Sequence, residues 1–233
     1  MIVYGRNAVH EALRGPRRVH RVWATKGAAR EQWLEDPGLA SGDELTELCG
    51  SPDHQGVCAD VEEYRYADPA TLLASDDAIV VALDAVQDPR NLGAVCRVAE
   101  CAGVAGVVIP ERRSAEVTPV VCKASAGAVE HLAIARVRNL ADYLRDAKEG
   151  GAWVYGASAA DAVPYDQPDY GGKVVVVFGS EGRGLRPRVR EMCDQLIALP
   201  LRGDLDSLNV SAAASAVVYG ILHFRQHLVD SAP

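Results

Sequence analysis

From residue 78 onward, short runs of consecutive apolar residues alternate with stretches in which apolar residues recur every three or four positions. The runs have the length of buried β-strands, expected at residues 79–83, 107–109, 132–135, 153–156, 174–178 and 196–199. The stretches between them predict helices at residues 92–101, after Thr118, after Asn139 and from about residue 211. Strict alternation of this kind indicates an α/β fold with a mainly parallel sheet covered by helices on both faces. In such sheets, ligands bind at the carboxyl ends of the strands.

Residues 1–65 predict a smaller α/β unit. We expect a helix over residues 7–13, strands at 20–25 and 57–61, and helical stretches at 28–34 and 43–49. Ser41 and Glu44 have the spacing of a capping box, which places the start of the last of these helices. Residues 66–77 are interpreted as a linker with one helical turn, which Asp68 caps and Pro69 begins. The chain is therefore expected to divide into residues 1–65, this linker, and a larger domain of residues 78–233.

Composition narrows the class of protein. Hydrophobic residues make up 48% of the 233 residues, enough for a large core. No apolar run approaches the ~20 residues of a membrane span, and the N-terminus lacks the apolar core of a secretory signal. Six cysteines show no C-x-x-C pair and no regular spacing. We interpret them as reduced thiols of a cytoplasmic protein and expect no metal site.

The net charge of −8 argues mildly against a nucleic-acid partner, because phosphate binding normally needs a basic surface. The cations are nevertheless gathered in three clusters, namely Arg14, Arg17, Arg18 and Arg21; Arg112, Arg113 and Lys123; and Arg183, Arg186, Arg188 and Arg190. Any one cluster could be a solvated helix face. Three of them, one next to a glycine-rich loop, favour an anionic polymer as the partner.

That glycine-rich loop follows the apolar run of residues 174–178. It has glycines at positions 179, 182 and 184 and one carboxylate, Glu181. The spacing G-x-x-G-x-G matches neither the dinucleotide fingerprint nor the P-loop. A glycine-permissive turn after a buried strand lets backbone groups approach a ligand closely. Glu181 could serve that ligand or could cap a helix.

Two further loops at strand ends contain unusual polar residues. Asn91 is expected to be the N-cap of the helix after the first strand of the larger domain. Arg97 lies about 140° around that helix from its buried stripe, so it projects away from the core. Taken alone, it could also be a solvated arginine. In the loop of residues 199–211, the last helix has three alternative N-caps, Ser207, Asn209 and Ser211.

In this order, the three loops resemble the motifs of the SpoU/TrmH family of RNA ribose 2′-O-methyltransferases, within the SPOUT superfamily. The motifs correspond to residues 88–97 (DPRNLGAVCR), 179–185 (GSEGRGL) and 207–211 (SLNVS). Residues 3–9, 55–57 and 124–128 also fit the family pattern, so the resemblance covers nearly the whole chain. The chain is most similar to the branch that methylates a guanosine ribose in large-subunit (23S) ribosomal RNA.

The resemblance implies a SPOUT domain with a deep trefoil knot, an exception to unknotted topology, preceded by an RNA-binding domain like the ribosomal L30e fold. It implies S-adenosylmethionine as the cofactor, RNA as the partner and a homodimer formed through the knot region. The residues that would contact the cofactor are Gly179, Leu199 and Leu208. The residues that would form the catalytic site are Arg97, Asn91, Glu181, Ser207 and Asn209. The residues expected to bind RNA phosphates are Arg14, Arg17, Arg18 and Arg21.

The chemistry of the implied reaction constrains the role of Arg97. A ribose 2′-hydroxyl is a poor nucleophile near neutral pH and needs deprotonation or a strong positive field. A guanidinium is too basic to act as an ordinary general base. We therefore expect Arg97 to hold the target phosphate and to stabilise the developing alkoxide, either in its own subunit's site or across a dimer.

Three alternatives stay open at this point. The chain could methylate a ribose of transfer RNA, or protect the ribosome of its own cell from an antibiotic. It could also be a non-catalytic RNA-binding or ribosome-assembly factor. The presence of all five catalytic-position residues argues against the last of these.

Overall fold

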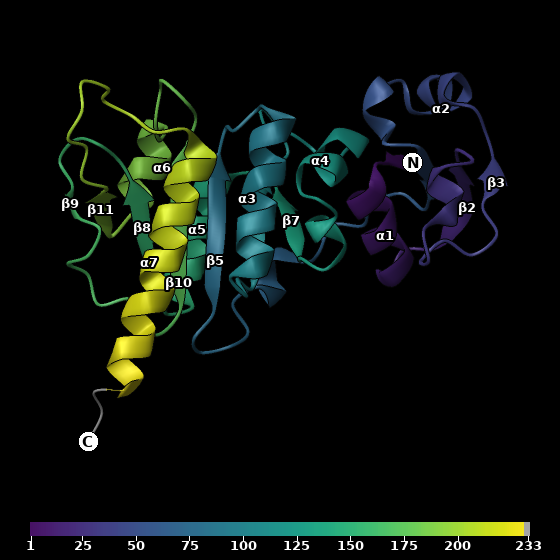
Figure 1. The fold of residues 1–233 in the computed structure, drawn as a ribbon. Coiled ribbons are helices and arrows are strands. Elements are labelled where there is room, and N and C mark those ends of the chain that lie inside the picture. Colours follow the sequence, from purple (N-terminus) through teal and green to yellow (C-terminus); the bar gives the residue numbers. More distant parts are fainter. Residues whose placement is uncertain (231–233) are drawn as a thin grey trace.

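The computed structural model describes residues 1–230 of the chain. It contains two sheets, each with its own helices, one built from the N-terminal residues and one from the residues after the linker (Figure 1). The expected α/β class is confirmed, and so is the parallel sheet of the larger part.

The N-terminal sheet has four strands in the order β1-β4-β2-β3. Its region contains β1 (Ile2–Tyr4), α1 (Arg6–Arg14), β2 (Val19–Ala24), the 3-10 turn η1 (Ala28–Arg30), β3 (Gly38–Leu39), α2 (Gly42–Cys49), the 3-10 turn η2 (Pro52–His54) and β4 (Val57–Val61). The predicted capping box is confirmed, because the Glu44 amide donates to Ser41 Oγ at 3.2 Å and the Ser41 amide to Glu44 Oε2 at 2.6 Å. The prediction of a helix over residues 28–34 is wrong, because only the 3-10 turn η1 forms there. Strands β1 and β3 are two or three residues long and form by pairing with β4 and β2, so the local sequence carries little signal for them.

The larger sheet has seven parallel strands in the order β7-β6-β5-β10-β8-β11-β9. After the linker turn η3 (Pro69–Thr71) come β5 (Ile79–Asp84), α3 (Pro89–Cys101), β6 (Gly106–Pro110), α4 (Pro119–Ala124), η4 (Ala128–Glu130), β7 (Ile134–Val137), α5 (Leu140–Glu149), β8 (Trp153–Ala157), β9 (Val163–Pro164), β10 (Val174–Gly179), α6 (Pro187–Met192), β11 (Gln195–Ala198) and α7 (Val210–Asp230). All six predicted strands are present, while β9 and α6 have no counterpart in the pattern analysis. Asp68 and Asn139 cap η3 and α5 as expected.

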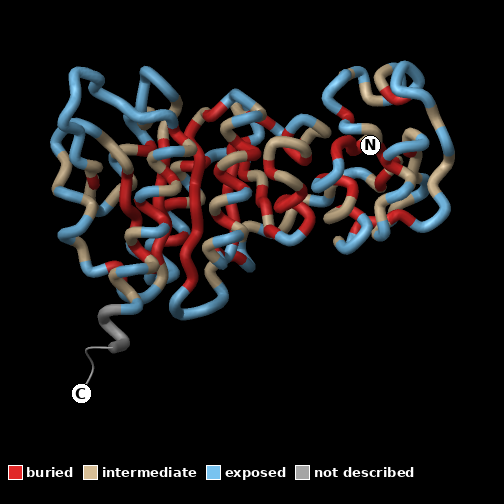
Figure 2. The backbone as a smooth tube through the Cα atoms, viewed as in Figure 1, coloured by how far each residue is buried: buried red, intermediate tan, exposed pale blue. Residues whose placement is uncertain are grey.

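Both faces of the larger sheet are covered, which explains the uninterrupted apolar runs. Alternate valines of β10 enter two different clusters of buried side chains. Helices α3 and α7 cover one face and pack against each other, whereas α5 and α6 cover the other face. Figure 2 shows the resulting buried centre and the exposed loops around it. Because the strands are parallel, the loops that follow β5, β10 and β11 emerge at one edge of the sheet.

A buried ion pair joins the N-terminal region to the larger part. The Arg17 Nε group donates to Glu130 Oε2 at 2.9 Å, and Arg17 Nη1 donates to the Glu62 carbonyl at 2.9 Å. The Arg17 and Glu130 side chains are only 7% and 0% exposed. The expectation that Arg17 binds RNA phosphates is therefore wrong, since its guanidinium is buried and its donors already have acceptors within the protein.

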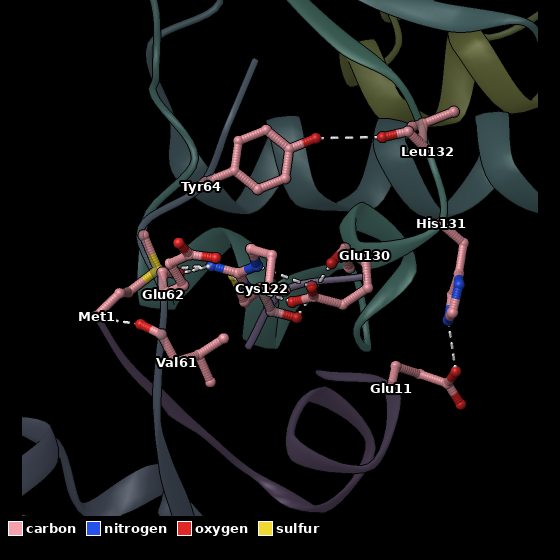
Figure 3. Close-up of polar contacts among 11 residues, drawn as sticks. Met1, Glu11, Val61, Glu62, Tyr64, Cys122, Glu130, His131 and Leu132 are labelled. Atoms are coloured by element: carbon pink, nitrogen blue, oxygen red, sulfur yellow. Dashed lines mark hydrogen bonds and ion pairs between the residues drawn. The ribbon is translucent and has the colours of Figure 1, made fainter. Parts of the chain in front are cut away.

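Further contacts surround this ion pair (Figure 3). The Tyr64 hydroxyl donates to the Leu132 carbonyl at 3.1 Å, and His131 Nε2 lies 2.8 Å from Glu11 Oε2. Buried residues of β1, α1 and α4 belong to the same apolar cluster as the α3 face of the larger sheet. Polar and apolar contacts thus cross the junction together, which fixes the N-terminal region beside the edge strand β7 (Figure 1).

Candidate active site

Three polar side chains from the three loops meet at the carboxyl edge of the larger sheet. Asn91 Nδ2 and Asn209 Nδ2 both donate to Glu181 Oε1, at 2.8 and 2.7 Å. Asn209 Nδ2 also lies 2.9 Å from Asn91 Oδ1, to which it donates. These residues are 90, 118 and 28 positions apart in the chain, so only the tertiary structure brings them together.

The start of α3 differs from the prediction in a way that makes this network possible. Asp88, rather than Asn91, is the N-cap, and its Oδ1 accepts from the Arg90 amide at 2.8 Å. Pro89 then occupies the first helical position, which suits its fixed φ angle and missing N–H group. Asn91 therefore lies within the first turn, and its amide is available to Glu181.

At the start of α7, the structure selects one of the three predicted N-caps. Asn209 Oδ1 accepts from the Ser211 amide at 2.9 Å and from the Ser211 hydroxyl at 2.6 Å. The Asn209 side chain thus uses its oxygen to cap the helix and its nitrogen to bind Glu181. Glu181 does not cap a helix; it is the acceptor that connects the glycine loop to the other two loops.

A cavity of about 350 Å³ lies next to this network. Gly179, Leu199 and Leu208, the three residues expected to contact the cofactor, all line it. Glu181 and Ser207 line it as well, while most of the remaining wall is apolar, including Phe178, Ile197, Leu201 and Val210. The cavity therefore offers an apolar slot with polar groups at one end, a composition that is typical of small-molecule sites.

Gly179 has a structural role that the spacing alone does not reveal. A Cβ atom at this position would lie 2.2 Å from the Gly184 carbonyl carbon and 2.5 Å from the Leu185 nitrogen. The loop folds back on itself there, and the Gly184 amide donates to the Ser180 carbonyl at 2.9 Å. Any side chain at position 179 would force this loop open and so deform the cavity wall.

Sequence reasoning missed a buried anchor beneath the loops. Asp84, the last residue of β5, is completely buried, and its carboxylate accepts from the Arg186 amide at 2.7 Å and from Arg186 Nε at 2.6 Å. The pair ties the end of the glycine loop to the strand that leads to Asn91. A single aspartate at the end of an otherwise apolar run was the available signal, because a buried carboxylate needs a partner.

Models of known families account for this architecture. Residues 78–219 match the SpoU rRNA Methylase family, and residues 2–67 match the RNA 2′-O ribose methyltransferase substrate binding domain. The chain belongs to the SpoU rRNA methylase family. The first of these matches includes all three loops of the polar network, so the family resemblance of the sequence is confirmed.

Relatives of the SpoU-family chain are similar along their whole length. A protein of the TrmH family of tRNA/rRNA methyltransferases from Staphylococcus saprophyticus is 35% identical, over 100% of this chain and 99% of the relative. A protein of the same description from Bacillus subtilis is 36% identical, over 96% and 95% of the two chains. The structure of an AdoMet-bound rRNA methyltransferase from Sinorhizobium meliloti superimposes with a TM-score of 0.80 at 25% identity, covering 97% of this chain and 87% of that one.

Arg97, the arginine of the first SpoU-family motif, is not part of the polar network. It is exposed on α3, in agreement with its predicted angle from the buried stripe. Within residues 1–230, the hydrogen bonds of Asn91, Glu181 and Asn209 do not include Arg97. Glu181 therefore connects the glycine loop to the first and third loops, and Arg97 makes no hydrogen bond to it within the described residues.

The other predicted RNA-binding arginines of the SpoU-family chain are exposed. Arg14 pairs with Glu11 at 3.1 Å, and the Arg21 guanidinium lies over the Trp23 ring, 5.0 Å from its centroid. Arg18 is exposed between them in the chain. In the part of the chain that the structure describes, no helix is long and apolar enough to cross a membrane, and no group of three or more His, Cys, Asp or Glu side chains is arranged to hold a metal ion.

Proposed function

We propose that this chain methylates the 2′-hydroxyl of a ribose in RNA with S-adenosylmethionine as the methyl donor, most specifically on a guanosine of 23S ribosomal RNA. The observation that supports this most directly is the Asn91–Glu181–Asn209 network beside the apolar cavity. The AdoMet-bound relative and the family's substrate-binding model support the cofactor and the RNA class.

The residues of the cavity suit S-adenosylmethionine. The apolar wall around Leu199 and Leu208 can enclose an adenine ring, and the turn at Gly179 exposes backbone groups to it. The volume of about 350 Å³ falls within the usual range of about 300–1,000 Å³ for small-molecule sites. When bound, S-adenosylmethionine supplies an electrophilic methyl group.

The chain's own residues position the nucleophile. The ribose O2′ attacks the methyl carbon, the bond between that carbon and sulfur breaks, and the hydroxyl proton leaves to solvent. Arg97 would hold the target phosphate and stabilise negative charge on O2′. Glu181, held by two amide donors, would keep the three loops in register, and Ser207 would face the reacting groups from the third loop.

The assembly is part of the same proposal. Residues 1–65 would form an L30e-like RNA-binding domain, residues 66–77 the linker, and residues 78–233 a SPOUT domain with a trefoil knot. Two copies would form a homodimer through the knot region, and Arg97, exposed on α3, would reach the partner subunit's site. The exposed Arg14, Arg18 and Arg21 would bind RNA phosphates, and the protein would act in the cytoplasm.

Methyl transfer to isolated RNA tests this function. Labelled S-adenosylmethionine is incubated with ribosomal RNA and, separately, transfer RNA from cells that lack the gene, and the 2′-O-methylated positions are mapped. We expect one labelled guanosine in 23S RNA; labelled transfer RNA would move the target to the alternative class. Absence of transfer to any RNA, together with absence of S-adenosylmethionine binding in calorimetry, would refute the proposed function.

A pair of matched variants tests the site itself. Asn209 and Asn139 both cap a helix with the side-chain oxygen, but only Asn209 also binds Glu181. Asn209→Ala should therefore weaken S-adenosylmethionine binding measurably, whereas Asn139→Ala should leave it unchanged. Equal effects of the two substitutions would show that the network does not support the cofactor site.

A further inference from the structure

A second and larger cavity, of about 850 Å³, lies at the same edge of the larger sheet but on the other face. Its wall comes mainly from the ends of β6 and β7 and from the first turns of α5, whereas the polar network joins the starts of α3 and α7 to the glycine loop after β10. Five arginines line this cavity: Arg112, Arg113, Arg136, Arg138 and Arg186. So many cations around one hollow are unexpected in a chain whose net charge is −8.

The carboxylates near the cavity do not cancel the charge of its arginines. Asp142 and Asp146 line it and share Arg145, at 3.2 and 2.9 Å, so these three side chains together carry one negative charge. Arg136 pairs with Glu116 at 3.0 Å, and Arg186 pairs with the buried Asp84.

Three of the lining arginines are not paired with a carboxylate of the described residues, so their positive charge is available to a ligand. Arg112, Arg113 and Arg138 are exposed, and within residues 1–230 none of them has an ion pair or a side-chain hydrogen bond to another residue. Arg113 also has a φ angle of 60°, a conformation that residues with a side chain rarely adopt. The cavity therefore presents a net positive surface made of guanidinium groups, which bind phosphate oxygens in a bidentate manner.

The wall of the cavity also carries unsatisfied donors. Among the described residues, Tyr143 Oη and Arg136 Nε are buried and have no hydrogen-bond partner. Both atoms have almost no accessible surface, so a ligand in the cavity would not contact them directly. The groups that such a ligand can contact are the exposed guanidinium groups of Arg112, Arg113 and Arg138.

The position of the cavity connects the two parts of the proposed RNA path. Arg186 lines the cavity and, through Asp84, holds the glycine loop of the active site. At the other end, Arg136 lies over the ring of Tyr66 in the linker, 5.1 Å from its centroid, and β7 is the edge strand beside the N-terminal region. A strand of RNA that runs from the N-terminal region to the active site would pass this hollow.

We propose that this cavity is a binding site for an RNA phosphodiester outside the target nucleotide, with Arg112, Arg113 and Arg138 as its phosphate ligands. The proposal rests on the proposed function for the class of its ligand. It predicts that these arginines contribute to RNA affinity and to its salt dependence, and that they do not contribute to the binding of S-adenosylmethionine.

The test compares two double variants with the same change in charge. Arg112→Gln/Arg138→Gln removes two of the cavity cations, whereas Lys148→Gln/Lys173→Gln removes two cations that pair with Asp194 and Asp76 away from the cavity. Binding of a fluorescein-labelled RNA hairpin of mixed sequence is measured by anisotropy at several salt concentrations, and S-adenosylmethionine binding is measured by calorimetry.

We expect the cavity variant to bind the hairpin more weakly and with a shallower salt slope. Each lost phosphate contact lowers the slope by about 0.7–0.9, so between about 50 and 200 mM salt the wild type should lose about ten-fold more affinity than the cavity variant. In methylation assays, the KM for RNA should rise while kcat stays unchanged. The lysine control should match the wild type in slope, and both variants should bind S-adenosylmethionine normally.

Two results would overturn the proposal. The first is a salt slope of the cavity variant equal to that of the wild type. The second is a loss of RNA affinity in the lysine control equal to that in the cavity variant. Binding of inorganic phosphate that the cavity variant loses, together with hairpin binding that it keeps unchanged, would assign the cavity to a free anion instead of RNA. A wild type that binds the hairpin with the expected slope but transfers no methyl group to any RNA would refute the proposed function while supporting this site.

Discussion

The buried pair of Arg17 and Glu130 is the contact whose loss should be most visible in the stability of this protein. Replacing Glu130 by Gln keeps the shape of the side chain and removes only its charge. The Arg17 guanidinium, 7% exposed, would then remain as a buried cation without a counter-ion. Removal of one partner from a buried pair costs about 3–5 kcal/mol, against a typical total stability of about 5–15 kcal/mol for a folded domain. Glu130→Gln should therefore remove a large part of the free energy of unfolding.

The structure provides a matched control in the same junction. Glu11 and His131 also connect the N-terminal region to the larger part, but their side chains are 22% and 35% exposed. An exposed pair of this kind contributes about 0–1 kcal/mol, because water screens the charges. Glu11→Gln should therefore cost much less than Glu130→Gln, although both substitutions remove one carboxylate from the same interface.

Urea denaturation followed by both fluorescence and circular dichroism measures these effects. Trp23 and Trp33 report on the N-terminal region, and Trp153 reports on the larger sheet. We expect Glu130→Gln to shift the midpoint strongly and to separate the two signals, since the regions then unfold independently. The double variant Arg17→Met/Glu130→Leu should recover most of the loss, because an apolar pair of similar volume often replaces a buried ion pair without cost. A loss below about 1 kcal/mol in Glu130→Gln, similar to that of Glu11→Gln, would refute the reasoning.

Three further predictions concern the active site and the junction. Arg97→Ala should abolish methyl transfer while S-adenosylmethionine binding, measured by calorimetry, stays nearly intact; comparable loss of both would contradict its role as a phosphate clamp. Glu181→Ala removes the acceptor of two amide hydrogen bonds, so calorimetry should show weaker S-adenosylmethionine binding with little change in the urea midpoint. Partial burial acts to raise the pKa of Glu11, but the hydrogen bond from His131 and the charge of Arg14 outweigh it and hold this pKa below its usual value of 4.5. The stability that Glu11 contributes should thus be present above about pH 4.5 and disappear as the pH falls through the lowered pKa; in acid titrations, Glu11→Gln should lack this component.

The sequence alone was sufficient for six of the seven strands of the larger sheet and for its helices α3, α4, α5 and α7. Its strands are buried on both faces, so apolar runs such as that of β10 identify them without knowledge of their partners. The elements that the pattern missed, among them β1, β3 and β9, are two or three residues long and exist only through pairing with strands distant in the chain. A local pattern contains no information about such pairing.

In the candidate site, too, the local sequence predicts some features and the fold decides others. The residue types and spacings of the three loops identify the family, because each loop carries its motif within a few residues. The sequence predicted Asn91 as the N-cap of α3, but the N-cap is Asp88. Both residue types cap helices, and only the fold shows that the Asn91 side chain has another partner, Glu181.

The sequence by itself therefore determined the class of the fold, the family and a set of residues that line the apolar cavity. Only the tertiary structure decided which of those residues touch, that Arg17 holds the two regions together instead of facing RNA, and that Asp84 anchors Arg186. The physical reason is that a periodic pattern reports whether a side chain is buried. A hydrogen bond or an ion pair depends on two side chains, here up to 120 positions apart, whose meeting is set by the packing of the whole molecule.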